Sequence, residues 1–362
     1  MLQRNPWNFL RVRLGVENAD QKASASEARQ RGDGMVKRWL EEGILVQDPT
    51  PAFYLYRQTF TATVGGLDNR FSRLGVVVSL DPKALLGPGP GPRGTSYAPD
   101  FCTDLRTFLH AEPFGTIRDA VRTAAPPVVR FLDDESVEHS LQVLDDPEGV
   151  GLVQEALRHV KAAPLDGGSR PAPGRQLALL VSGDDPGLVL MPAHRVYRHL
   201  PEPDLERALE KLGAAFSCED LPYLGADAVE ALLATLPENV HGFALRRRGG
   251  DTVRLFQAPA GKFSIPGASD GIALDSAVLS GVVEREFFGA AAGGARVLQA
   301  SEGHRAMHLL DSDPDSAVAV LTRSVPPRTL LRIAASGREL GPSLALLHPR
   351  PWTGLVSMRA DG

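Results

Sequence analysis

The stretch 53-FYLYRQTF-60, together with 73-RLGVVVSL-80, decides how this chain begins to fold. Aromatic, aliphatic and β-branched residues crowd both runs, which is typical of strands. The turn-forming run Asp48-Pro49-Thr50-Pro51 precedes the first of them, so a strand is expected from Phe53 to Phe60. We predict that the second run pairs back on the first, as a hairpin with a long loop that contains glycine.

Upstream of this hairpin the sequence predicts one helix, from about Ser24 to Glu42. Within this polar stretch the apolar residues fall at helical spacing: Met35, Val36, Trp39 and Leu40. Gly43 follows at once and is expected to end the helix. The residues from about Asn8 to Leu14 are expected to be extended.

Downstream of the hairpin, a run of glycine and proline at residues 87–99 cannot sustain a helix or a central strand, so we expect a loop there. The apolar spacing beyond it predicts, in order, a helix at about 116–124, strands at 127–132 and 140–144, and a helix at 147–161. The first part of the chain therefore mixes both kinds of element.

The second part continues this mixture. Residues 175–198 indicate a second hairpin, turned at Gly183–Gly187. The later elements are expected to be helices at about 204–211, 226–236 and 274–289, a hairpin at 241–257, a buried strand at 316–322 and a short helix at 326–337. The fold class is therefore α+β, with two lobes of mixed or antiparallel sheets flanked by helices: residues 1–170, with the 87–99 loop, and residues 175–362.

Composition narrows the possible partners. The 362 residues carry a formal charge of −5, which gives no general attraction to nucleic acid or to an anionic membrane. The longest basic run, Arg246–Arg248, falls at the expected tip of a hairpin and is interpreted as a solvated turn. We therefore expect neither a nucleic acid nor a membrane as partner.

Two cysteines, Cys102 and Cys218, lie far apart and show neither zinc-site nor disulfide spacing. This usage fits a reducing cytoplasm. No apolar run reaches the roughly 18 to 20 residues that span a bilayer, and the first residues lack the apolar core of a signal peptide. We expect a cytoplasmic protein without a metal site.

Several stretches together resemble a bacterial and archaeal family, the domain of unknown function ten-fifteen. They are "NPWNFLRV" (5–12), "WLEEGILVQDPTPAFYLYRQTF" (39–60), "EHSLQVLDDPE" (138–148), "LMPAHRVYRHL" (190–200), "LDSAVLSGVV" (274–283) and "GPSLALLHPRPWTGL" (341–355). The family is similar to the ParB and sulfiredoxin group, in which a turn at a helix start meets nucleotide phosphates and some members are serine kinases. The resemblance also implies an association with serine biosynthesis.

This resemblance points to one loop, "LDGGSRPA", in which family members carry an Asp-Gly-His-His-Arg turn that opens a helix. Three family positions match, namely Asp166, Gly167 and Arg170, whereas Gly168 and Ser169 replace the two histidines. Pro171 and Pro173 follow, and proline is unfavourable inside a helix. We interpret residues 166–170 as a degenerate site that retains, at most, binding of an anion or nucleotide.

Two further family signatures differ in the same way. The 87–99 loop stands where a His-Glu-x-Thr stretch is expected, and residues 341–345 read "GPSLA" instead of Pro-Pro-Lys-Ser-Thr. Because charge stabilisation and proton transfer dominate phosphoryl transfer, the loss of two histidines, a glutamate and a lysine predicts a loss of catalysis.

Two pairs of polar residues are further ligand-binding candidates. Arg57 and Gln58 close an otherwise apolar strand, where they line a site or form structural hydrogen bonds. His194 and Arg195 follow one strand and precede a helix, where family members have an Asn-Arg pair. They are interpreted either as ligand or interdomain contacts or as turn and cap residues.

The sequence therefore favours a catalytically degenerate, uncharacterised family member that acts as a binding or scaffold protein. One alternative is a serine-type small-molecule kinase that uses ADP or ATP with Mg²⁺. Another is an interaction subunit of an intact paralogue. The expected partners are a small phosphorylated ligand or nucleotide, or another protein.

Overall fold

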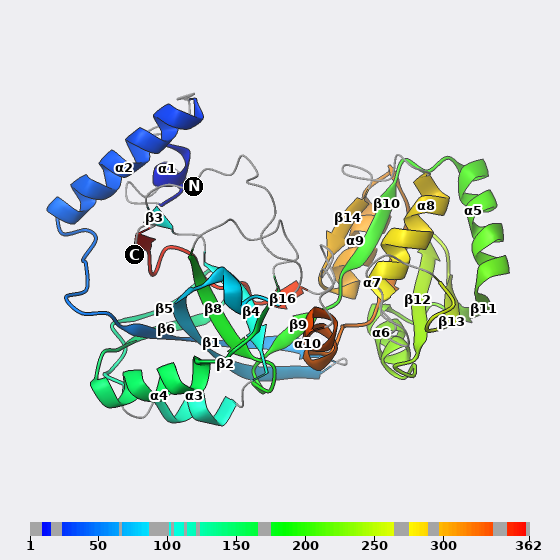
Figure 1. Cartoon of the computed structure of the whole chain (residues 1–362). Helices are drawn as coiled ribbons and strands as arrows, with labels where there is room; N and C mark the ends of the chain where they lie inside the picture. Colours follow the sequence, from blue (N-terminus) through cyan, green and yellow to red (C-terminus); the bar gives the residue numbers. More distant parts are fainter. Residues whose placement is uncertain are drawn as a thin grey trace.

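The computed structural model of the chain describes residues 9–15, 24–64, 67–86, 101–102, 105–111, 114–120, 124–165, 175–263, 275–288, 297–335 and 346–359. It contains two large β-sheets, which lie apart with helices around each (Figure 1). This is the α+β class that the sequence predicts. No helix among the described residues combines the length and the apolar character needed to cross a membrane.

The first sheet has seven strands. Their spatial order is β5 (Val129–Leu132), β6 (Glu138–Leu144), β1 (Phe53–Val64), β2 (Leu67–Leu80), β8 (Gln176–Ser182), β4 (Arg106–His110) and β7 (Ala162–Pro164). Only β4 and β8 run parallel among these neighbours. The hairpin of β1 and β2 is confirmed, but its strands pair as far as Val64 and Leu67, so its turn is short rather than long.

Both faces of the first sheet are covered, because β1 and β2 carry apolar residues at successive positions. Leu55 belongs to a core with α3 (Phe114–Ala120) and α4 (Pro147–Leu157). Tyr56 belongs to the core on the other face, with α10 (Pro327–Ala335) and the chain end. A short 3₁₀ turn, η1 (Pro82–Ala84), follows β2.

The second sheet has six strands, all antiparallel. Their order is β11 (Ser217–Pro222), β13 (Thr252–Pro259), β12 (Val240–Arg247), β15 (Ser316–Thr322), β10 (His194–Arg198) and β14 (Val297–Ala300). One face packs on α5 (Glu202–Ala215), α7 (Asp275–Val278) and the π-helical turn η2 (Leu279–Val283), from which α8 (Glu284–Phe288) continues. The other face packs on α6 (Ala226–Ala234) and α9 (Gly303–Ser312).

Two small two-stranded sheets pair segments that are far apart in the sequence. Strand β16 (Leu346–His348) pairs with β9 (Val189–Met191), and β17 (Met358–Arg359) pairs with β3 (Phe101–Cys102). The last described residues of the chain therefore contact elements of the first part.

The predicted hairpin at 175–198 is wrong. Strand β8 pairs with β2 and β4, whereas β9 pairs with β16. The connecting turn is held elsewhere: the Asp185 carboxylate accepts the N–H of Leu74 at 2.8 Å, and Gly183 donates to the carbonyl of His110 at 2.8 Å. These contacts fix the turn beside β2 and β4. Strand β9 therefore does not fold back on β8 and pairs with β16 instead.

The lobe boundaries at residues 170 and 175 stay a prediction, but the sheets do not change there. Strand β8, which was expected to open the second lobe, lies inside the first sheet. All seven of its residues are buried, as expected for a central strand. The 87–99 loop lies outside the described residues.

Of the two predictions for the N-terminal residues, one is confirmed and one is wrong. Helix α2 (Ala25–Glu41) is confirmed and begins with a capping box between Ser24 and Glu27. The extended segment expected at 8–14 is wrong, because Phe9–Leu14 forms the helix α1. Phe9 packs edge-on against Trp39 of α2 at 5.6 Å, so contact with α2 accounts for this short helix.

Candidate functional site

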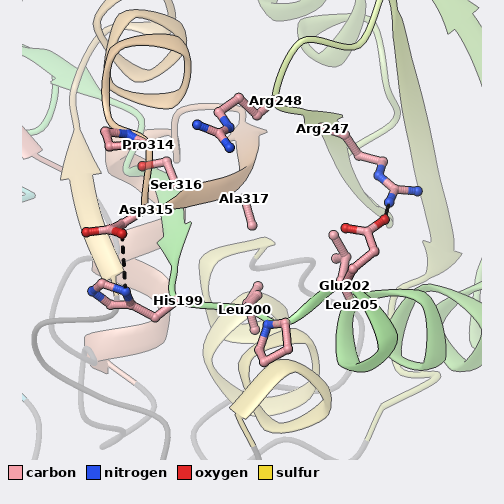
Figure 2. Close-up of a pocket in the computed structure, with 11 residues that line it drawn as sticks. His199, Leu200, Glu202, Leu205, Arg247, Arg248, Pro314, Asp315, Ser316 and Ala317 are labelled. Carbon is pink, nitrogen blue, oxygen red and sulfur yellow. Dashed lines mark hydrogen bonds and ion pairs between the residues drawn. The ribbon is translucent and has the colours of Figure 1, made fainter.

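A pocket of about 560 Å³ opens at one end of the second sheet, where β10 and β12 end and β15 begins (Figure 2). Its apolar lining comes from Leu200, Pro201, Leu205, Pro314 and Ala317. Its polar lining comes from His199, Glu202, Arg247, Arg248, Asp315 and Ser316. The pocket is large enough for a small metabolite.

One wall is fixed by an unusual backbone conformation. His199 has a φ of 54°, in the left-handed region that side chains other than glycine rarely adopt. Its N–H donates to the carbonyl of Asp315 at 2.9 Å, and its ring lies 3.9 Å from the Asp315 carboxylate. These contacts hold the strained residue against the β15 side of the pocket.

Two arginines near the pocket are already neutralised by the chain. Arg198 lies 2.7 Å from the Asp313 carboxylate and 3.4 Å from that of Asp315. The N–H of Asp315 lowers the pKa of the Asp313 carboxyl, and Arg198 adds to this effect. Arg247 donates to both Glu202 and Glu206 of α5.

Arg248 differs from these two. Its backbone N–H donates to the carbonyl of Ala317 at 3.0 Å, which places the residue at the rim of the pocket. Figure 2 shows its side chain over the pocket on the side of Ser316, whereas Arg247 turns toward Glu202. The exposed Arg248 guanidinium has no side-chain partner in the part of the chain that the structure describes. A guanidinium with free N–H donors binds a carboxylate or a phosphate.

The solvated turn predicted at Arg246–Arg248 is wrong for the first of these three residues. Arg246 is buried, donates to both Asp311 oxygens at 3.0 Å and stacks 4.4 Å from the centre of the Tyr223 ring. Successive strand residues point to opposite faces, which separates Arg246 from Arg247. Two residues of this basic run line the pocket, but the charge pattern in the sequence did not predict a pocket there.

The predicted loop site, Asp166, Gly167, Gly168, Ser169 and Arg170, lies outside the described residues. The two other candidate pairs lie on different sheets, with Arg57 and Gln58 on β1 and His194 and Arg195 on β10. The structure does not bring these two pairs into one site.

Gln58 has a structural role. Its amide N–H donates to the carbonyl of Arg350 at 3.1 Å, and its carbonyl accepts from the buried Arg73. Arg57 lies on the opposite face of β1. Burial raises the pKa of the Asp185 carboxyl, and the charge of Arg57 is one of several weaker influences that lower it.

His194 and Arg195 lie within a strand rather than at a turn, so the capping role expected for them is wrong. His194 accepts the N–H of Thr322 at 3.1 Å, and its other ring nitrogen lies 2.6 Å from Glu230. Because Nδ1 is an acceptor, Nε2 carries the hydrogen and donates a hydrogen bond to the Glu230 carboxylate. His194 is thereby fixed as a bridge between β15 and α6.

Arg195 points to the other face, toward the helical segment 275–288. It donates to Glu284, to the Ser280 hydroxyl at 2.9 Å and to the carbonyl of Ser276 at 3.3 Å. The Tyr197 hydroxyl donates to the same Glu284 at 3.3 Å, and burial raises the pKa of Tyr197. The pair therefore anchors helices on both faces of the second sheet.

The family model described as "Protein of unknown function (DUF1015)" matches residues 1–84 of this chain. This range includes α2 and the β1–β2 hairpin, and the resemblance from residue 138 onward lies outside it. No curated protein matches. Among solved structures, a conserved hypothetical protein from Pyrococcus furiosus is similar at 10% identity over 71% of this chain and 93% of that chain, with a TM-score of 0.32. That score supports no statement about function.

Proposed function

We propose that this chain is a binding protein that takes a small carboxylate- or phosphate-bearing ligand in the pocket beside Arg248. The observation that carries the proposal is the contrast among the cations at this end of the sheet. Arg198 and Arg247 are paired with carboxylates of the chain, and Arg248 faces the pocket with no carboxylate partner among the described side chains. The apolar residues Leu205 and Ala317 offer a surface for the rest of the ligand.

This proposal keeps the favoured interpretation of the sequence, a catalytically degenerate cytoplasmic member of its family. A residual nucleotide site at Asp166–Arg170, with or without Mg²⁺, remains a second part of it. A ParB- or sulfiredoxin-like element at that loop, a working serine-type kinase and an interaction subunit of a paralogue remain alternatives.

The test is calorimetric titration of the purified full-length protein with inorganic phosphate, serine, phosphoserine, ADP, ATP and CTP, with and without Mg²⁺. We expect at least one of the anions to bind, and Arg248→Ala to weaken that binding by roughly ten- to hundredfold, the value of a charge-assisted hydrogen bond. Arg328→Ala is the matched control, because Arg328 is an exposed arginine that pairs with Glu238 away from the pocket. It should leave the affinity unchanged.

Three outcomes separate the alternatives. Binding that Arg170→Ala removes and Arg248→Ala does not would move the site to the 166–170 loop. Mg²⁺-dependent consumption of ATP or ADP with serine would establish the kinase instead. If no anion binds and a partner protein co-purifies with the chain, the proposed small-molecule function is wrong.

A further inference from the structure

We propose a second, smaller oxyanion site inside the second lobe, between Arg195 and the start of α7. Four buried polar atoms there have no hydrogen-bond partner among the residues that the structure describes: Arg195 Nε, His241 Nδ1, Ser276 Oγ and Thr322 Oγ1. The exposed fraction of these four residues is between 1% and 5%. Folded proteins rarely leave such groups unsatisfied, because a buried polar atom that has lost water without gaining a partner destabilises the fold.

The strand register brings three of the four residues to one face of the sheet. β12, β15 and β10 are consecutive neighbours, with Phe243 opposite Thr322 and Arg195 opposite Val320. Phe243 and Val320 both belong to the core beneath α5 and the 275–288 helices. Residues directly opposite, or two apart on one strand, share a face, so Thr322, Arg195 and His241 lie on this side as well.

The fourth residue reaches the same place from the helix. Ser276 accepts an N–H of Arg195 at its carbonyl, 3.3 Å away. Its neighbour Asp275 accepts the N–H of Gly242 at 3.0 Å and lies 3.7 Å from Nδ1 of His241. The first turn of α7 is thus held between His241 on β12 and Arg195 on β10.

The charges around this point are already balanced. Asp275 pairs with Arg323 at 2.7 Å, and Glu284 pairs with Arg195. The unsatisfied Arg195 Nε can only donate a hydrogen bond, and the two hydroxyls can donate as well. The complementary ligand is therefore one that accepts several hydrogen bonds through oxygen atoms, a carboxylate or a phosphate.

The cluster also reaches the surface. Ser280, which accepts from Arg195, is exposed and lies in the π-helical turn η2. Turns of this type occur frequently at functional sites, where the extra residue redirects side chains. Ser280 thus connects the buried Arg195 guanidinium to the protein surface.

The experiment compares melting midpoints of the full-length protein in chloride, inorganic phosphate and acetate at matched ionic strength, which also distinguishes the two kinds of oxyanion. The variants are Thr322→Val and Ser276→Ala, with Thr61→Val, at an exposed position of β1, as control. In chloride, Thr322→Val should melt no lower than the native protein, because its hydroxyl has no partner to lose.

In phosphate or acetate the native protein should be stabilised, and the apparent Kd should be about tenfold weaker in both site variants, the equivalent of one hydrogen bond. The comparison is repeated in an Arg248→Ala background, where anion binding in the pocket is weakened, so that the difference between the native and variant residues at 276 and 322 reports on the Arg195 cluster alone. Equal stabilisation of the native protein and both site variants, or no stabilisation by either anion, would overturn the proposal and assign the cluster to buried water.

Discussion

Arg73 and Arg248 are two arginines of one chain whose surroundings are opposite. Arg73 is 1% exposed and donates to the carbonyls of His348 and Pro349 and to Gln58, in the first sheet. Arg248 is exposed at the rim of the pocket on the second sheet, without a described side-chain partner. The first guanidinium makes three hydrogen bonds to the chain, whereas the second makes none to a side chain in the part of the chain that the structure describes.

The difference shows which polar side chains stabilise the fold. The segment 348–352 is held on the first sheet through its backbone, by Arg73, Gln58 and Tyr56. These side chains therefore assemble the fold. A cation that makes no hydrogen bonds to the chain is available to a ligand. Candidate site residues and structural residues therefore differ in whether their polar groups are already paired.

The largest effect is expected from Arg73→Met. The substitution leaves two buried carbonyls and Gln58 without a donor, and should lower the free energy of unfolding by about 3 kcal/mol or more. Denaturant unfolding measures it. Arg70→Met, an exposed position on the same strand, is the control and should change stability by less than about 0.5 kcal/mol. Similar values for the two variants would contradict the role of Arg73.

His110 gives a pH dependence to the first sheet. It is fully buried, neither ring nitrogen has a hydrogen-bond partner within the described ranges, and burial lowers its pKa to about 4. The unfolded chain, with a pKa near 6.5, binds the proton first, so stability is complete above about pH 6.5 and falls as the pH drops toward 4.

Between pH 6.5 and 5 the expected loss is about 2 kcal/mol, which His110→Leu should remove from the pH profile of unfolding. His304→Leu, at an exposed histidine of α9, should leave the profile as it is. An unchanged profile in His110→Leu would show that His110 does not titrate on unfolding.

A smaller effect is expected from Tyr56→Phe. The Tyr56 hydroxyl accepts the N–H of Trp352 at 2.9 Å and lies 2.6 Å from Nδ1 of His139, which in turn contacts Asp133 at 2.9 Å. Removal of the hydroxyl should cost about 1 to 2 kcal/mol in urea unfolding, because the buried His139 and the Trp352 N–H each lose a partner. Tyr54→Phe, whose hydroxyl contacts Asp48 near the surface, should cost less.

The smallest effect on stability belongs to Arg248→Ala, which should change the free energy of unfolding by less than about 0.5 kcal/mol. The guanidinium makes no described side-chain contact, and its backbone hydrogen bond to Ala317 remains. Thermal unfolding of Arg248→Ala and Arg73→Met, measured under the same conditions, compares the two effects on stability directly. A destabilisation comparable to that of Arg73→Met would show that Arg248 is structural and would weaken the proposed pocket.

Much of the fold could be predicted from local patterns. Helix α2 carries its cap and its apolar stripe within one stretch, and the β1–β2 hairpin joins neighbours in sequence. The predicted turn at Gly183–Gly187 was real, but pairing with distant strands overrode the hairpin. Among the site candidates, Gln58, His194 and Arg195 proved to be buried contacts of the fold, and Arg248 was read only as part of a charged turn.

By itself the sequence determined the α+β class, most of the helices and the apolar strands, because periodicity and turn residues act over a few neighbouring positions. Three features instead depend on tertiary contacts: β8 completes the first sheet, residues 348–352 lie on that sheet, and Arg248 has no side-chain partner among the described residues at the pocket. Those outcomes depend on contacts between residues more than one hundred positions apart, such as Leu74 with Asp185 and Arg73 with His348. No local pattern encodes such contacts, since they arise only when the sheets have formed.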